Sequence, residues 1–188
     1  MRALLLALPF AILPLSLAIA GDHDHDHGSL DKHEHGVSSM NIGLEGNKLQ
    51  IELESPAMNV VGFEHEAKSA EDKATLAAAL AKLEQPLTLI SLPAAAECAV
   101  TALELESLLI GDDEHEHKHD HADEGCEVHS DIDADYQLTC AKPEALDSVS
   151  LAALFKAFPG TTKINVQLIG PKGQKGAELN AASPSISF

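Results

Sequence analysis

The chain has 188 residues, a length that suits one domain once a short leader is removed. It carries 30 acidic residues against 12 basic ones, which gives a formal net charge of −18 at pH 7. Arg2 is the single arginine, so the rest of the chain cannot make the bidentate arginine contacts that favour nucleic-acid or nucleotide binding. The acidic surface attracts cations, and we expect no nucleic-acid partner.

The first 20 residues have the pattern of a secretory signal peptide. Arg2 precedes an apolar stretch that is interrupted by Pro9 and Pro14 and ends on the small-residue pattern AIA at 18–20. A membrane anchor is the alternative, but the uncharged run is only just long enough to span a bilayer, and prolines weaken it as a helix. We therefore predict residues 1–20 as a signal peptide, export from the cytoplasm, and a mature form with no membrane span.

Two segments of the remaining chain, residues 21–35 and 111–129, differ from the rest in composition. Both are rich in His, Asp and Glu and nearly free of apolar residues, so neither can bury enough surface to order itself. We predict a His/Asp-rich N-terminal segment at 21–35 and a single domain at 36–188, which carries a disordered histidine-rich loop at 111–129.

The domain begins with a predicted β-hairpin and a helix. Apolar and polar residues alternate at 40–44 and again at 49–53, and the residues EGN at 45–47 form the turn between them. The helix is predicted between Ser69, its N-cap, and Pro86, with an apolar stripe of leucines along one face.

The second half of the domain contains further strands and a second helix. Two strands are predicted in ECAVTALELESLLI at 97–110 and DIDADYQLTCA at 131–141, and the second has apolar residues on one face. A shorter helix is predicted at about 148–158, then a strand at 163–170 and a terminal extended segment. This order predicts an α+β fold, with an antiparallel β-sheet and two helices.

Three cysteines in an exported chain allow one disulfide and one remaining thiol. Cys98 begins one predicted strand and Cys140 ends another, so antiparallel pairing of these strands would bring the two together. Cys126 lies in the predicted loop and is the alternative partner. We predict a Cys98–Cys140 disulfide, with residues 111–129 leaving the hairpin at its other end.

The eleven histidines lie mostly in or beside the two histidine-rich segments. The N-terminal tract has His23, His25 and His27, the mid-chain tract has His115, His117, His119 and His121, and the others are His33, His35, His65 and His129. Closely spaced imidazoles among carboxylates suit zinc, nickel or copper. The alternatives are a solvated loop and an expression tag, but the alternation with acidic residues and the mid-chain position favour metal binding.

The predicted hairpin brings some of these histidines together. In an antiparallel pair the start of one strand lies near the end of its partner. His33 and His35 should therefore lie near the chain that leaves Leu53 toward His65. Segments distant in the sequence would then converge on one edge and form a metal site.

Several stretches resemble the zinc-regulated periplasmic zinc-binding proteins of Gram-negative bacteria, the ZrgA-type family. They are HEHGVSSMNIGLEGNKLQIELESPAMNVVGFEHEA at 33–67, HSDIDADYQLTCA at 129–141, FPGTTKINVQLIGPKGQ at 158–174 and AELNAASPSISF at 177–188. The resemblance implies a periplasmic protein that is made under zinc limitation and assists a zinc-importing ABC transporter. It also implies metal ligands at His33, His35, His65, His129 and Asp131.

We therefore expect a periplasmic protein, not an enzyme, that captures or buffers zinc and has the periplasmic receptor of a zinc importer as its partner. A copper or nickel chaperone is an alternative, because the same ligands bind those metals. If the leader is cleaved after Ala20, the new terminus Gly21-Asp22-His23 would bind copper(II) or nickel(II) in a square plane. A copper–zinc superoxide dismutase is a weaker alternative, because such enzymes use an arginine that the mature chain lacks.

Overall fold

The structure is a computed structural model and describes residues 34–109 and 130–188. These residues belong to one unit, His33–Phe188. The predicted signal peptide, most of the N-terminal segment and nearly all of the histidine-rich loop lie outside the described residues. No helix in the described ranges is long and apolar enough to cross a membrane.

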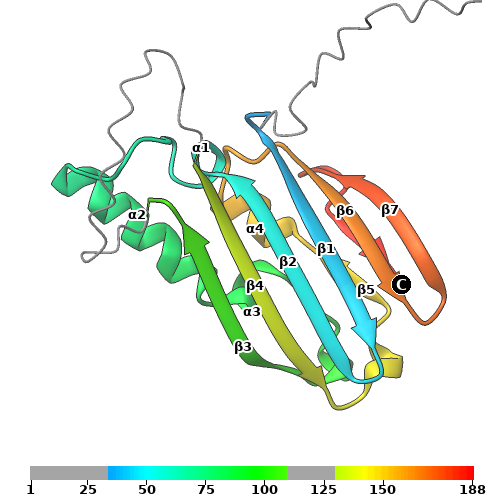
Figure 1. Cartoon of the computed structure of the whole chain (residues 1–188). Coiled ribbons are helices and arrows are strands. Elements are labelled where there is room, and N and C mark those ends of the chain that lie inside the picture. The colour runs from blue at the N-terminus through cyan, green and yellow to red at the C-terminus, as the bar shows by residue number, and fades with distance from the viewer. Residues whose placement is uncertain (1–33, 110–129) are drawn as a thin grey trace, which may run out of the picture. The chain divides into compact units, whose positions relative to one another are not determined.

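Six strands form one mixed sheet in the order β3-β4-β2-β1-β6-β7 (Figure 1). They are β1 Val37–Glu45, β2 Lys48–Pro56, β3 Cys98–Ser107, β4 Asp131–Cys140, β6 Lys163–Gly170 and β7 Gly173–Leu179. Two short strands, β5 Ser148–Ser150 and β8 Ser185–Ser187, form a separate antiparallel pair. Together with the helices, these sheets confirm the predicted α+β fold.

One strand pair departs from the antiparallel arrangement. β1 pairs antiparallel with β2, as the hairpin requires, but its other edge pairs parallel with β6, where Val37 lies opposite Lys163. The other ladders of the six-stranded sheet are antiparallel. A parallel pair needs a long crossover connection, and here the whole chain between β1 and β6 supplies it.

The hairpin turn and the disulfide lie where the sequence predicts them. Glu45 pairs with Lys48, which leaves Gly46 and Asn47 as a two-residue turn. Gly46 has φ +60°, a conformation that glycine adopts without a steric penalty. Cys98 and Cys140 face each other across the β3–β4 ladder and form a disulfide, which confirms the predicted pair.

The longest helix begins at a capping box. In α2 (Ala70–Leu83) the Ser69 hydroxyl accepts a hydrogen bond from the Asp72 N–H at 3.0 Å, and the Asp72 carboxylate accepts one from the Ser69 N–H at 3.2 Å. These two bonds satisfy donors that the first turn would otherwise leave without partners. The predicted first helix is thereby confirmed.

The second predicted helix is shorter than expected, and two single-turn helices were not predicted. The shorter helix α4 is Ala152–Ala157, because residues 148–150 form strand β5 instead of its first turn. The additional α-helices are α1 Ala57–Val60 and α3 Pro86–Leu89, and two 3₁₀ turns cover Ala94–Ala96 and Pro143–Ala145. A single turn is too short to produce a helical repeat of apolar residues.

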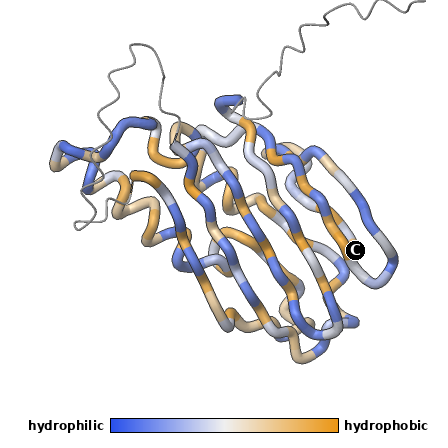
Figure 2. Tube along the Cα trace, in the orientation of Figure 1, coloured by the Kyte–Doolittle hydropathy of each residue, from blue (hydrophilic) through white to orange (hydrophobic). Residues whose placement is uncertain are grey.

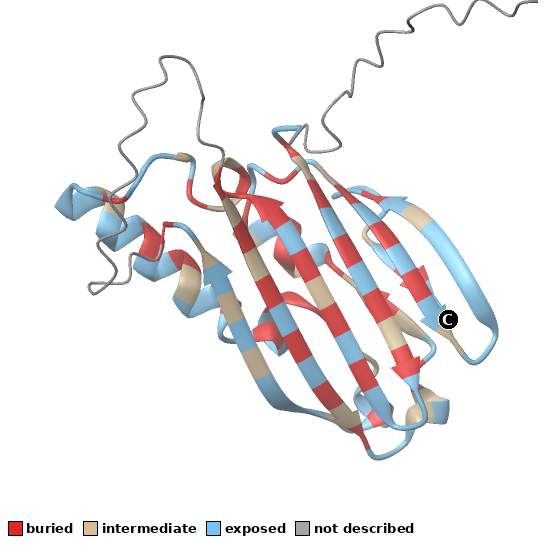
Figure 3. Ribbon diagram, viewed as in Figure 1, coloured by how far each residue is buried: buried red, intermediate tan, exposed pale blue. Residues whose placement is uncertain are grey.

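The two faces of the large sheet differ in burial. Along the central strands, buried apolar residues alternate with exposed polar ones (Figures 2 and 3). The apolar residues join the helices in one core, whose largest fully buried side chains include Tyr136, Met40, Ile42, Leu49, Ile51 and Leu83. The helices cover only this face, so the polar side chains of the other face meet solvent (Figure 1).

Candidate metal site

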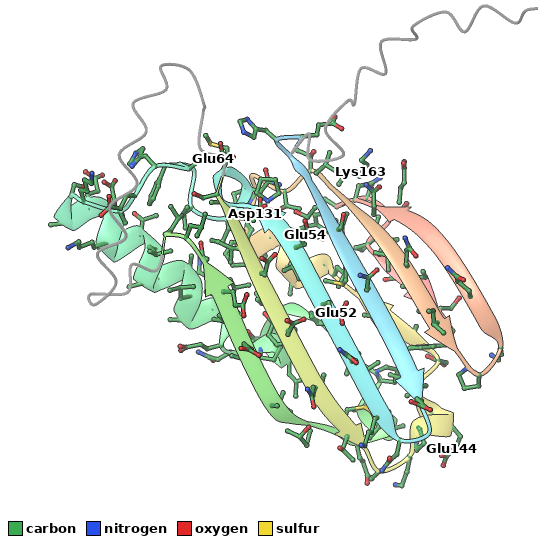
Figure 4. The ribbon with its side chains drawn as sticks, viewed as in Figure 1. Glu52, Glu54, Glu64, Asp131, Glu144 and Lys163 are labelled. Carbon is green, nitrogen blue, oxygen red and sulfur yellow. A yellow bond between two sulfur atoms is a disulfide. The ribbon has the colours of Figure 1, made fainter. Side chains whose placement is uncertain are left out.

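Three segments meet at one end of the sheet. Ser39 in β1 pairs with Glu54 in β2, and Pro56 at the end of β2 pairs with Asp131 at the start of β4. The residues that precede β1, follow β2 and open β4 therefore share this end, where Figure 4 labels Glu64 and Asp131. We call it the His35 end, after the histidine that lies two residues before β1.

His35 contacts a carboxylate from the segment that follows α1. Its Nε2 atom lies 3.0 Å from Oε1 of Glu64, although the two residues are 29 positions apart in the sequence. The Glu64 side chain is 13% exposed, whereas that of His35 is 51% exposed. A mostly buried carboxylate thus contacts an imidazole that is open to solvent. A carboxylate in this position can orient a histidine that binds a metal ion.

His65, the next residue, makes different contacts. Its ring stacks on Phe63 with centroids 4.9 Å apart, and its Nδ1 atom lies 3.1 Å from the Glu66 carbonyl oxygen. The pKa of Asp72 at the start of α2 is lowered mainly by its hydrogen bond from Ser69, and His65 lowers it further. His65 thus contacts its own neighbours in the segment, Phe63 and Glu66, and Glu64 is the residue of this motif that pairs with His35.

Glu64 was missed by the sequence reasoning, which weighed only the histidine of the GFEH motif. Neighbouring side chains in a non-helical segment point in different directions, so the motif presents either its carboxylate or its imidazole to His35. A signal existed: metal-binding histidines usually donate to a carboxylate, and Glu64 is the acidic residue within that motif.

Asp131 lies at the start of β4, at the same end of the sheet. Its backbone oxygen accepts a hydrogen bond from the Ser107 hydroxyl at 2.7 Å, and its side-chain Oδ1 atom is buried. The preceding residue, Ser130, is buried, and its carbonyl accepts a hydrogen bond from the Ala57 N–H at 2.8 Å. The backbone around Asp131 is therefore fixed to both β3 and α1.

Beyond Asp131, the solvent-facing side of the sheet is strongly acidic. Its carboxylates form two cross-strand rows, Glu106–Asp133–Glu54 and Glu104–Asp135–Glu52. Burial first, and then the carboxylates of Glu54, Asp131, Glu106 and Asp135, raise the pKa of Asp133 from 3.8 to about 6. We call the six residues of the two rows the acidic sheet face. Its negative field favours cations near the His35 end.

The described residues supply part of the predicted ligand set. His35 and Asp131 lie at the His35 end, whereas His65 stacks on Phe63. The remaining predicted ligands lie outside the described residues: His33, His129, the N-terminal tract His23, His25 and His27, and the loop tract His115, His117, His119 and His121. Within residues 34–109 and 130–188, no three His, Cys, Asp or Glu side chains are grouped closely enough to hold an ion.

A comparison with models of protein families shows the family of the chain. No curated protein matches the chain. A family model described as "ZrgA family zinc uptake protein" matches residues 32–188, which include every described residue. The chain therefore belongs to the ZrgA family of zinc uptake proteins.

Proposed function

We propose that the protein is a periplasmic zinc carrier, not an enzyme, that captures or buffers zinc and assists its uptake through an ABC importer. The observation that carries this proposal is the His35–Glu64 pair, which lies 3.0 Å apart at the same end of the sheet as Asp131. Membership of a zinc uptake family supports zinc as the cargo.

The donor types at the His35 end suit zinc. Zn²⁺ binds imidazole nitrogen and carboxylate oxygen, usually with four ligands. His35 and Glu64 supply an imidazole and a carboxylate that are in contact, Asp131 opens β4 at the same end, and His33 and His129 adjoin this end in the sequence. Because the His35 side chain is 51% exposed, an ion held there stays accessible to an acceptor protein.

The two histidine tracts extend this role. Each offers many overlapping sets of imidazole and carboxylate ligands, so we expect graded affinity and fast exchange. The acidic sheet face raises the local concentration of cations beside the His35 end. Loose capture by the tracts and tighter binding at the His35 end together would suit a protein that passes zinc on to an importer's receptor.

Competition with a chromophoric zinc chelator tests the proposal on the full-length mature protein. His35→Ala and Glu64→Gln should each weaken the tightest site at least about tenfold, as loss of a ligand or its carboxylate partner does in other zinc sites. Glu66→Gln is the matched control, because Glu66 is a nearby exposed carboxylate that pairs with Lys68 at 3.0 Å. Equal affinities in all three variants would refute a metal site at the His35 end.

The role in uptake needs a cellular test. A strain without the gene should grow poorly in a zinc-chelated medium, and the wild-type gene should restore growth better than the His35→Ala gene. Purification of the protein from cells identifies the metal it carries. Copper or nickel in place of zinc would favour the chaperone alternative.

A further inference from the structure

We propose that Asn59 is a positioning residue that holds His35 against Glu64; this rests on the proposed function, because the pair acquires its purpose from metal binding. Asn59 lies in α1, and its side chain hydrogen-bonds to the residues that follow His35. It acts through Gly36, the residue between His35 and the first strand.

The Asn59 side chain forms hydrogen bonds through both its amide oxygen and its amide nitrogen with residues 36–38, which follow His35. It is 3% exposed, and its Oδ1 atom accepts a hydrogen bond from the Gly36 N–H at 2.6 Å. Its Nδ2 group donates to the Val37 carbonyl at 3.0 Å and to the Ser38 hydroxyl at 3.3 Å. One buried side chain therefore fixes three consecutive residues next to the histidine.

The other side of Gly36 is fixed by the chain that enters β6. The Gly36 carbonyl accepts hydrogen bonds from the N–H groups of Thr162 and Lys163, at 2.8 and 2.9 Å, and from the Thr162 hydroxyl at 2.9 Å. Gly36 has φ +87°, and a Cβ atom added there would lie 2.8 Å from the Thr162 hydroxyl oxygen. The N–H of Gly36 is thus held by Asn59 and its carbonyl by Thr162 and Lys163, so the position of Gly36 is set from two sides.

The same asparagine also anchors the chain that carries Glu64. Asn59 lies in α1, which leads to Glu64 five residues later. A Cβ atom at Gly160 would lie 2.6 Å from the Asn59 carbonyl oxygen, so the turn before β6 packs directly on the Asn59 backbone. Asn59 thus links the two segments whose side chains meet, and its hydrogen bonds set the distance between His35 and Glu64.

This arrangement predicts a specific effect on metal binding. A ligand pair held in place before the metal arrives loses less freedom on binding, and the affinity is correspondingly higher. Release of the Gly36 segment would leave His35 attached to the sheet only through the strand that starts at Val37. The zinc site should weaken even though both of its side chains remain.

The alternative is that Asn59 serves only the fold, as part of a buried polar network that includes the Ser38–Ser55 hydroxyl pair at 2.8 Å. A double-mutant cycle separates the two roles. The variants are Asn59→Ala, Glu64→Gln and their combination, each assayed for zinc by chelator competition and for stability by urea unfolding. Val149→Ala, a truncation of a fully buried side chain in β5, is the control for lost stability.

We expect Asn59→Ala to weaken the tightest zinc site about tenfold, and to have little further effect when Glu64 is already Gln. Val149→Ala should lower stability and leave the zinc affinity unchanged. If Asn59→Ala does not fold, Thr162→Val is the substitute, because it removes the hydrogen bond from the Thr162 hydroxyl to the Gly36 carbonyl. This variant should weaken zinc binding about threefold, and it too should have little further effect when Glu64 is already Gln.

Three outcomes would overturn the role of Asn59. The first is that the folded Asn59 or Thr162 variant binds zinc with unchanged affinity. The second is that its loss of affinity and that of Glu64→Gln are independent, so that the double variant shows the product of the two losses. The third is that Val149→Ala loses as much zinc affinity as Asn59→Ala. If Glu64→Gln weakens binding while Asn59→Ala does not, only the positioning role fails. If His35→Ala and Glu64→Gln both bind zinc as the wild type does, the proposed function fails as well.

Discussion

Replacement of Asp133 by Asn should stabilise the protein at neutral pH. Asp133 lies in the middle of the row Glu106–Asp133–Glu54, where each neighbour in the adjoining strands is another carboxylate. Like charges directly opposite each other destabilise a sheet. Burial first, and then these neighbouring charges, raise the Asp133 pKa from 3.8 to about 6, which corresponds to about 3 kcal/mol. Because the side chain is partly exposed, screening by solvent reduces the effect, and we expect a gain of about 1 kcal/mol.

The sign of the pH dependence follows from the direction of the shift. The folded protein holds the Asp133 proton more tightly than the unfolded chain, so the stability that this proton confers is complete below about pH 4. That stability is lost as the pH rises through the folded-state pKa of about 6. Asn carries no charge at any pH. The advantage of Asp133→Asn should therefore be absent below about pH 4, grow between about pH 4 and 6, and be complete above that window.

Urea unfolding in the presence of a metal chelator, at about pH 4, 5, 6 and 7.5, measures this difference without a contribution from bound ions. Glu144→Gln is the matched control, because Glu144 is an exposed carboxylate at the opposite end of the sheet from Glu64 and its removal changes the net charge equally (Figure 4). The control should show a small difference that does not follow the same pH curve. A neutral-pH stability of Asp133→Asn no higher than that of the wild type, or a gain that persists unchanged at about pH 4, would refute the reasoning.

Three further predictions concern the core, the disulfide and the loop. Tyr136→Phe should be neutral or stabilising by about 1 kcal/mol in urea unfolding, because the Tyr136 hydroxyl is buried without a hydrogen-bond partner in the described part of the chain; a loss of stability would reveal such a partner. The double replacement of Cys98 and Cys140 by Ser should cost about 4 kcal/mol, since the disulfide closes a sequence separation of 42 residues; a loss below about 1 kcal/mol would contradict the loop-entropy argument. Deletion of Gly111–Gly125 should lower the zinc stoichiometry in isothermal titration and leave the tightest binding phase intact; loss of that phase would place the tight site in the loop.

The parts of the fold that depend on neighbouring residues could be predicted from the sequence. The β1–β2 hairpin follows from period-two alternation around a glycine turn, and α2 follows from its capping box. The disulfide follows from two cysteines at opposite ends of predicted strands. The parallel β1–β6 pair could not be predicted, because alternation shows which face of a strand is apolar and not which strand lies beside it.

The candidate site shows the same division. The hairpin geometry predicted that His35 approaches the chain beyond β2, and the structure places it there, against Glu64. The choice between Glu64 and His65 depends on the direction of single side chains in a segment without regular structure, which no periodicity describes. Asn59 was also out of reach of the sequence, because its partners belong to residues 36–38 and become neighbours only when β1 and β2 pair.

The parallel pairing of β1 with β6 has a consequence for the order of folding. The hydrogen bond from Thr162 to Gly36 joins residues 126 positions apart, so one of the longest loops in the chain must close before it forms. Contacts of such long range form slowly, whereas the β1–β2 hairpin beside them is local. A nascent chain that ends before β6 therefore already has His35, Asn59 and Glu64 but lacks half of the support for Gly36. We expect zinc to bind tightly only after β6 has paired with β1, which would keep incomplete chains from competing for the metal.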